Sequence, residues 1–192
     1  MLFKCCVVKT MERIIPFIFI FIYNKRETNF DSRLSGSNFI TDDLELPVLR
    51  ELNLSCNTFN SLQPLIQHLK APSLEKLDIS FNRLSSLPCL TANFPRLWSI
   101  TASNNTIKEL LPEAVKGLRI LDVNSNDIGS LNARIGLLGG PGGLERLDVK
   151  CNRFRVPNYT VLEKGTEATL AWLRNRLPAS DVPNETSPGD VD

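Results

Sequence analysis

The strongest constraint on the fold of this chain is one apolar pattern that recurs along its middle part. In the clearest copy, SLEKLDISFNRLSSLP (73–88), five apolar residues surround one asparagine: Leu74, Leu77, Ile79, Leu84, Leu87 and Asn82. The spacing of two residues between Leu77 and Ile79 is typical of a short strand with one buried face. The later leucines suit an irregular or short helical return. One such unit cannot bury its apolar edge alone, so it needs neighbours on both sides.

The neighbouring copies are present and in register. Five copies of L-x-x-L-x-L-x-x-N, with Ile, Val or Ala at some leucine positions, begin 25, 23, 21 and 26 residues apart at Leu49, Leu74, Leu97, Leu118 and Leu144. This period and pattern are typical of leucine-rich repeats. The sequence therefore predicts an α/β leucine-rich-repeat solenoid of about five repeats, with short parallel strands on its concave face and a C-terminal capping helix.

The ninth position of each copy predicts a structural asparagine ladder. The side-chain amides of the ladder can form hydrogen bonds with backbone groups of their own coil and of the adjacent coil. Each of these backbone groups would cost about 1–3 kcal/mol if it were buried without a partner. The ladder residues are Asn57, Asn82, Asn105, Asn126 and Asn152.

The rest of the chain divides around the repeats. Residues 1–33 form an N-terminal extension with an apolar run of ten residues at 14–23, whereas a membrane-spanning helix needs about 20. This run is either a targeting or anchoring segment, or part of a poorly ordered extension or an incorrectly called reading frame. We expect the solenoid at 34–160, the capping helix at 161–178 and a disordered acidic tail at 179–192, which has no basic residue.

The segment TEATLAWLRNRL (166–177) has the pattern of an amphipathic helix. Thr166 is expected to be its N-cap, and Leu170, Leu173 and Leu177 form one apolar stripe. Pro178 is expected to end it. The helix either caps the last repeat or binds a partner.

Net charge and cysteine content limit the possible partners and the cellular compartment of the protein. The net formal charge of +1 gives no general attraction to nucleic acid or to acidic membranes. We therefore expect a protein partner of unknown identity, and membrane contact only if the N-terminal run is a signal or anchor. The five cysteines are odd in number and scattered, which favours a reducing, cytoplasmic compartment over the secretory pathway.

The sequence carries no recognisable catalytic or metal-binding constellation. The single histidine, His68, has no cysteine or carboxylate at ligand spacing. Cys89 is expected in the core. We expect no enzymatic activity and no cofactor.

Function is therefore expected on the concave face, where strand residues alternate with the buried leucines. Three aspartates at the centre of this face form a mildly acidic stripe, flanked by two aromatic side chains as apolar anchors. Such a surface suits a basic or mixed protein partner; alternatively, the charges only keep the face soluble and Phe81 packs against the next repeat. The predicted contact residues are Glu51, Asn53, Lys76, Asp78, Phe81, Trp98, Thr101, Asp122, Arg146 and Asp148.

The repeats resemble the short intracellular leucine-rich repeats of Ras-pathway scaffolds. The segment LEKGTEATLAWLRNRLP (162–178) resembles the segment that follows the repeats in the leucine-rich-repeat-containing protein forty family, mainly at Lys164-Gly165-Thr166 and Trp172-Leu173-Arg174. The resemblance implies the C-terminal part of a longer repeat protein. We expect the chain to act as a non-enzymatic protein-interaction scaffold inside the cell. A secreted or membrane-tethered recognition protein, and a regulatory subunit that positions a signalling enzyme, remain alternatives.

Overall fold

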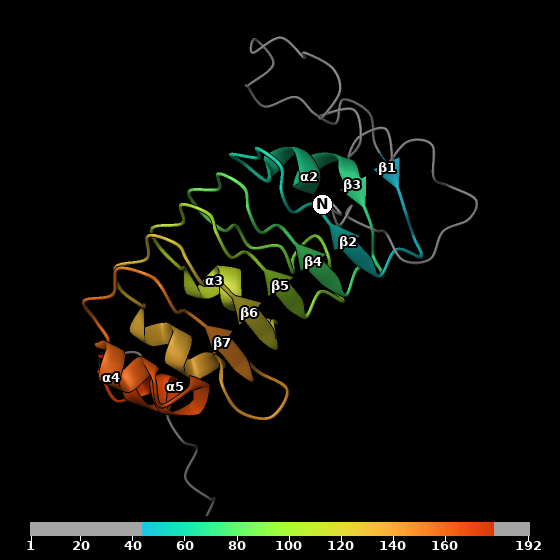
Figure 1. Cartoon of the computed structure of the whole chain (residues 1–192). Coiled ribbons are helices and arrows are strands. Elements are labelled where there is room, and N and C mark those ends of the chain that lie inside the picture. The colour runs from blue at the N-terminus through green and yellow to red at the C-terminus, as the bar shows by residue number, and fades with distance from the viewer. Residues whose placement is uncertain (1–43, 179–192) are drawn as a thin grey trace, which may run out of the picture.

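The computed structural model describes residues 44–178, which form a stack of coils that each add one short strand to a sheet (Figure 1). The predicted N-terminal extension, the first ten residues of the predicted solenoid and the acidic tail lie outside this range. In chain order the elements are β1 (Leu44–Glu45), β2 (Glu51–Asn53), α2 (Gln63–His68), β3 (Leu69–Lys70), β4 (Lys76–Asp78), β5 (Ser99–Thr101), α3 (Pro112–Val115), β6 (Ile120–Asp122), the 3-10 helix η2 (Ala133–Leu138), β7 (Arg146–Asp148), α4 (Tyr159–Leu162) and α5 (Thr166–Arg174).

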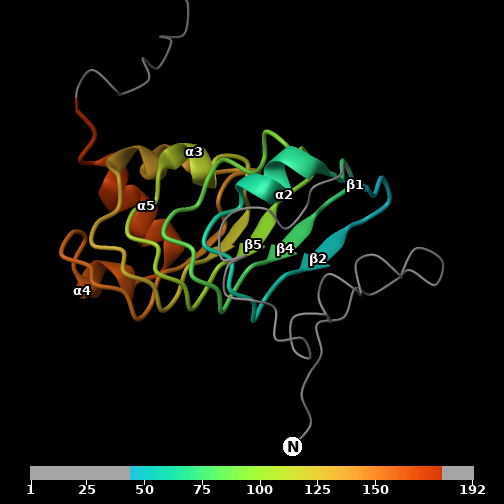
Figure 2. The same ribbon diagram turned by 90° about the horizontal axis from the view of Figure 1, so that it is seen from above.

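The main sheet is parallel and follows the order of the repeats. Its strand order is β2-β4-β5-β6-β7, and each strand pairs with the same strand position of the next repeat. A second, two-stranded parallel sheet joins β1 to β3. Figure 2 shows α2 and α3 on the side away from the strands. Every coil thus runs from the sheet to a return segment and back.

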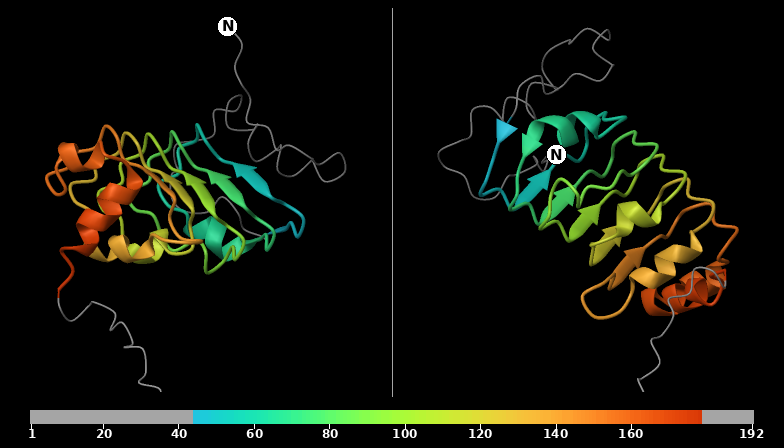
Figure 3. Two further views of the ribbon diagram at one scale, coloured as in Figure 1. Left: turned by 90° about the horizontal axis from the view of Figure 1, so that it is seen from below. Right: turned by 180° about the vertical axis from the view of Figure 1, so that it is seen from behind.

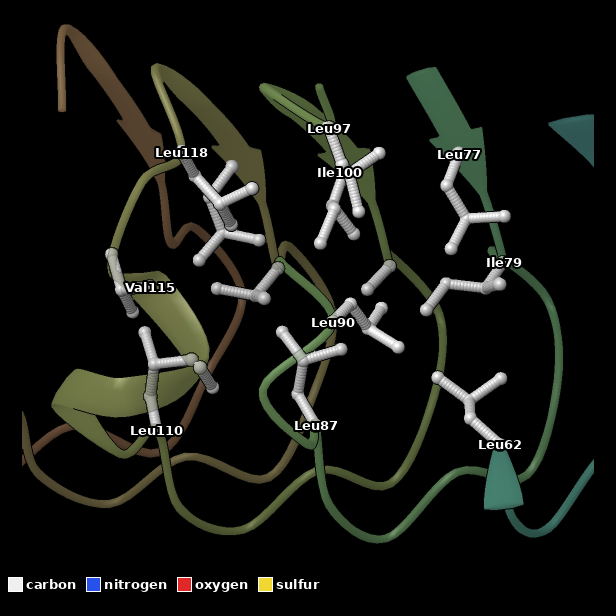
Figure 4. Close-up of a cluster of buried hydrophobic side chains, with 14 of the residues drawn as sticks. Leu62, Leu77, Ile79, Leu87, Leu90, Leu97, Ile100, Leu110, Val115 and Leu118 are labelled. Carbon is white, nitrogen blue, oxygen red and sulfur yellow. The ribbon is translucent and has the colours of Figure 1, made fainter. Parts of the chain in front are cut away.

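The core lies between the sheet and the return segments. Each central strand residue points inward with its equivalents in neighbouring coils, as Leu77 and Ile100 show (Figure 4). Residues of the returns, such as Leu87, Leu110 and Val115, close the core from the other side. Because a fully buried leucine contributes about 1.5–3 kcal/mol, stacking of the coils supplies the stability that one repeat lacks.

Four of the five asparagines at the ninth repeat position link consecutive coils, whereas Asn57 bonds, among the described residues, only to carbonyl oxygens of its own repeat. Asn105 Nδ2 donates to the carbonyl oxygens of Ile79 and Ala102 at 3.0 and 3.1 Å, and its Oδ1 accepts from the Leu84 N–H at 3.0 Å. Asn82, Asn126 and Asn152 make equivalent bonds. No buried side-chain nitrogen or oxygen among the described residues lacks a hydrogen-bond partner.

The C-terminal end of the stack is covered by α5, which packs on η2 and β7 (Figure 3, in red). Leu170 and Leu173 of α5 are buried. Gly136 of η2 makes this contact possible, since a Cβ there would lie 2.6 Å from the Arg174 nitrogen and 2.7 Å from the Leu170 oxygen. The backbones of η2 and α5 therefore touch.

Three details differ from the sequence prediction. The N-cap of α5 is Gly165, at φ 95°, and not Thr166, whose hydroxyl instead accepts a 2.9 Å hydrogen bond from the Leu147 N–H. Helix α5 ends at Arg174, and a short additional helix, α4, precedes it. Cys89 is exposed rather than in the core, and its sulfur lies 3.7 Å from the Thr91 hydroxyl oxygen.

Candidate functional site

The strand register places the predicted contact residues in two rows on the outward face of β2, β4, β5, β6 and β7, which we call the concave surface. The first row is Glu51, Lys76, Ser99, Ile120 and Arg146. The central row is Asn53, Asp78, Thr101, Asp122 and Asp148. Thus the eight predicted contact residues that lie in strands share one surface, together with Ser99 and Ile120 between them.

Three residues of the central row support the turn that follows their strand. Asp78 Oδ1 accepts from the Ser80 N–H at 2.9 Å, and Asp122 Oδ1 accepts from the Asn124 N–H at 2.9 Å. Asn53 makes the same contact in the first described repeat, where its Oδ1 accepts from the Ser55 N–H at 2.8 Å. An acceptor oxygen is therefore sufficient at this position, and a negative charge is not required for the turn.

The charges on the concave surface are partly compensated. Lys76 Nζ lies 2.7 Å from Glu51 Oε1, and Arg146 Nε lies 2.7 Å from Asp148 Oδ2. By contrast, neither Asp78 nor Asp122 forms an ion pair within residues 44–178. Both carboxylates are half-buried. They are the two acidic groups of the row that a partner could still neutralise.

The environment of Asp122 is unfavourable for its charged form. Burial raises the pKa of the Asp122 carboxyl above its usual value of 3.8, and the nearby charges of Asp148 and Asp78 raise this pKa further. The Asn124 N–H and the Arg146 side chain oppose the rise. Asp122 is thus a carboxylate whose ionisation the fold makes slightly costly.

Trp98 stands beside the concave surface, directly before β5. Its ring is half-buried and lies near two cations: the ring centroid is 5.6 Å from Lys76 Nζ and 6.0 Å from the Arg119 guanidinium carbon. Arg119 is held in turn by Glu145, with Nη2 2.6 Å from Oε1. Sequence reasoning identified Trp98 but missed Arg119 and Glu145. The signal was available, because both occupy the second repeat position as Trp98 does.

Phe81 occupies a strained position at the turn after β4. It is 55% exposed and has φ 54°, in the left-handed region that bulky residues rarely adopt. The equivalent residue of every other described repeat has a similar φ of 54° to 57°: Cys56, Asn104, Ser125 and Cys151. The positive φ is therefore a general feature of the repeat, whereas a phenyl ring at this position occurs only at Phe81 among the five described repeats.

Within 44–178 no group of three or more His, Cys, Asp or Glu side chains is placed to hold a metal ion. His68 is half-buried at the end of α2. No helix in this part of the chain combines the length and apolar character needed to cross a bilayer. The concave surface is thus the best-supported candidate site.

Comparisons with known proteins match the repeats. Two family models described as leucine-rich repeats match residues 73–94 and 45–61. The chain is 28% identical over 119 residues to human PH domain leucine-rich repeat-containing protein phosphatase 1, covering 61% of this chain and 7% of that protein. It is 44% identical over 79 residues to human oligodendrocyte-myelin glycoprotein, covering 39% and 17%. The chain thus spans less than a fifth of either relative.

The solved structure of a leucine-rich-repeat protein of Leptospira interrogans is also similar, with 24% identity and a TM-score of 0.45 over 60% of this chain and 35% of that chain. The family-model matches agree with the parallel sheet and the repeating asparagine bonds of the structure. The described part of this chain is therefore an α/β leucine-rich-repeat solenoid, as its sequence predicts.

Proposed function

We propose that this protein is a non-enzymatic scaffold that binds another protein through its concave surface. The observation that carries the proposal is the charge of the central row. Asn53 supports its turn with an uncharged amide, whereas Asp78 and Asp122 make the same hydrogen bond with a carboxylate. The turn does not need their charge, so a partner is the simplest reason for it. Extended concave surfaces are also what solenoid proteins commonly use for binding.

The aromatic side chains of the predicted site supply apolar contacts for such a partner. Trp98 contacts two cations, Lys76 and Arg119, and Phe81 is exposed at the turn after β4. Aromatic residues often contribute most of the energy of an interface. The first strand row provides additional polar contacts through Lys76 and Arg146, each already oriented by an ion pair.

We further propose an intracellular signalling setting, as the resemblance of the repeats to those of Ras-pathway scaffolds implies. The three cysteines of the described chain, Cys56, Cys89 and Cys151, are exposed and form no disulfide. This fits a reducing compartment.

The relatives favour two further candidate roles. Similarity to the oligodendrocyte-myelin glycoprotein supports a secreted or membrane-tethered recognition protein. Similarity to the phosphatase with leucine-rich repeats supports a regulatory chain that positions a signalling enzyme. All three roles use the same solenoid, and they differ in compartment and partner.

Proximity labelling in the native cell, with the tag at the C-terminus, tests these roles. Asp78, Asp122 and Asp148 are changed together to lysine, and a control protein carries lysine at the exposed residues Glu109, Glu113 and Glu163. A reproducible cytosolic partner set that is lost only in the aspartate variant would support the scaffold and its concave surface. Secretory-pathway neighbours would overturn the intracellular assignment, and partners unaffected by the aspartate variant would place binding elsewhere.

A further inference from the structure

The charges of the central row are distributed unevenly. Asp148 is neutralised by Arg146 at 2.7 Å, while Asp78 and Asp122 have no ion-pair partner among the described residues. Asp78 accepts two hydrogen bonds from Ser80, both at Oδ1, and Asp122 accepts one from the Asn124 N–H, so each carboxylate still has oxygen lone pairs available. Two half-buried anionic acceptors therefore face the solvent from the same row.

The register fixes how far apart these carboxylates are. Asp78 pairs with Thr101, and Thr101 pairs with Asp122, so the two aspartates lie two strands apart. With neighbouring strands about 4.8 Å apart, their backbones are separated by about 10 Å. The residue between them, Thr101, is uncharged and short, so it leaves space above β5 for a segment that crosses the strands.

We propose that the partner binds the concave surface with a basic, extended segment whose two cationic side chains pair with Asp78 and Asp122. This inference rests on the proposed function and adds the chemistry of the partner to it. In a polyproline II segment, residues i and i+3 lie on the same side and are about 9.3 Å apart. Two arginines or lysines at that spacing match the spacing of the two carboxylates.

Two further observations support this choice of partner. Asn53 shows that an amide would satisfy the turn without charge, so the charge of Asp78 and Asp122 is available for recognition. Trp98 precedes Thr101 in the same repeat and is flanked by Lys76 and Arg119. Its ring can contact the apolar residues between the two cations of the segment, since aromatic rings pack well against proline and aliphatic stems.

A peptide titration tests the inference directly. The probe is a fluorescent peptide of four Arg-Pro-Pro triplets, and the control peptide has the same composition with its arginines in adjacent pairs. Both are titrated with the full chain, with the double variant Asp78→Asn and Asp122→Asn, and with the matched variant Glu109→Gln and Glu113→Gln. The asparagine variant keeps the acceptor that Asn53 provides in its own repeat, so the fold is preserved.

We expect the triplet peptide to bind the full chain and the glutamine variant equally, and the asparagine variant about ten-fold more weakly, as loss of two ion pairs requires. We also expect the paired-arginine peptide to bind the full chain several-fold more weakly than the triplet peptide. Equal binding of the triplet peptide to all three proteins, or no binding at all, would overturn the basic partner. Equal binding of the two peptides would overturn the spacing.

The failures of the two proposals can be told apart. If the asparagine variant retains the partners that the lysine variant loses in cells, the concave surface is a binding site but its partner is not a basic segment. If partners are unaffected by both variants, the proposed function itself fails. Loss of the same partners in both variants, with the glutamine protein unaffected, supports both proposals.

Discussion

At the residue scale, the central row shows how one position can serve the fold and a partner together. The side chain at this position must accept a hydrogen bond from the turn, which either an amide or a carboxylate can do. A carboxylate adds a charge that burial and neighbouring aspartates disfavour at Asp122. Replacing that charge separates the two roles, because the hydrogen bond can be kept while the electrostatic cost is removed.

We therefore expect Asp122→Asn to stabilise the protein slightly at neutral pH. The pKa of Asp122 is raised in the folded state, so the folded protein favours the protonated carboxyl. The stability that this gives is complete below the unfolded pKa of 3.8 and is lost as pH rises through the folded pKa. At pH 7 the variant should gain at most about 0.5 kcal/mol after solvent screening. The gain should shrink as pH falls toward 3.8. Urea unfolding at several pH values measures it, and a less stable variant at pH 7 would contradict it.

The asparagine ladder gives a larger residue-scale effect. Asn105→Ala removes the partner of the Leu84 N–H and of the Ile79 and Ala102 carbonyls, so we expect a loss of about 2–4 kcal/mol in unfolding free energy. Asn57→Ala is the matched control. Asn57 is only half-buried and bonds to carbonyls of its own repeat, so its loss should be about 1 kcal/mol. Equal losses in denaturant unfolding would contradict a role of the ladder in joining coils.

At the element scale, the contact between η2 and α5 depends on one glycine. A methyl group at Gly136 would lie 2.6 and 2.7 Å from backbone atoms of α5, and backbone cannot move aside as a flexible side chain can. We expect Gly136→Ala to displace α5 and to lower stability by about 1–3 kcal/mol. Gly129→Ala is the control, because no atom lies within 4 Å of a Cβ there. Thermal unfolding compares the two, and equal melting temperatures would show that α5 adjusts freely.

The elements also show which parts of the fold a sequence can predict. The strands follow from the two-residue spacing of apolar positions such as Leu77 and Ile79, a pattern that is local and repeated. The N-cap of α5 does not follow, because Thr166 is a suitable cap by composition and its hydroxyl is instead used by the Leu147 N–H. That choice depends on a contact with a distant strand. The exposure of Cys89 likewise depends on how its return segment is packed.

At the scale of the whole molecule, the regular repeat made the candidate site predictable as a surface. Once the strands stack in register, Asp78, Thr101 and Asp122 must lie in one row. The ion pair of Asp148 with Arg146, which leaves Asp78 and Asp122 as the unpaired carboxylates of that row, could not be predicted because it depends on side-chain conformations. For the same reason, the contacts of Lys76 and Arg119 with the Trp98 ring were not foreseen, although their positions in the repeat place both residues next to it. The pattern of surface charges is the only information that the described residues give on the chemistry of the partner.

The same stacking has a consequence for cooperativity that the chain's two tryptophans can report. Trp98 lies beside β5 and Trp172 lies in α5, with Leu121 of β6 fully buried in the strands between them. Since each coil of a solenoid contacts only its neighbours, coupling between the two reporters must pass through β6. We expect wild-type urea transitions to coincide when each tryptophan is observed alone, in Trp172→Phe and Trp98→Phe proteins.

Leu121→Ala should separate these transitions, because a cavity costing about 2–5 kcal/mol weakens the contact between the two halves. Leu52→Ala is the control, since β2 is at the end of the main sheet and both reporters lie on the same side of it. That variant should lower stability while the transitions remain together. Coincident transitions in Leu121→Ala would mean that the ladder and the sheet hydrogen bonds alone keep the coils coupled, and that the solenoid unfolds as one unit.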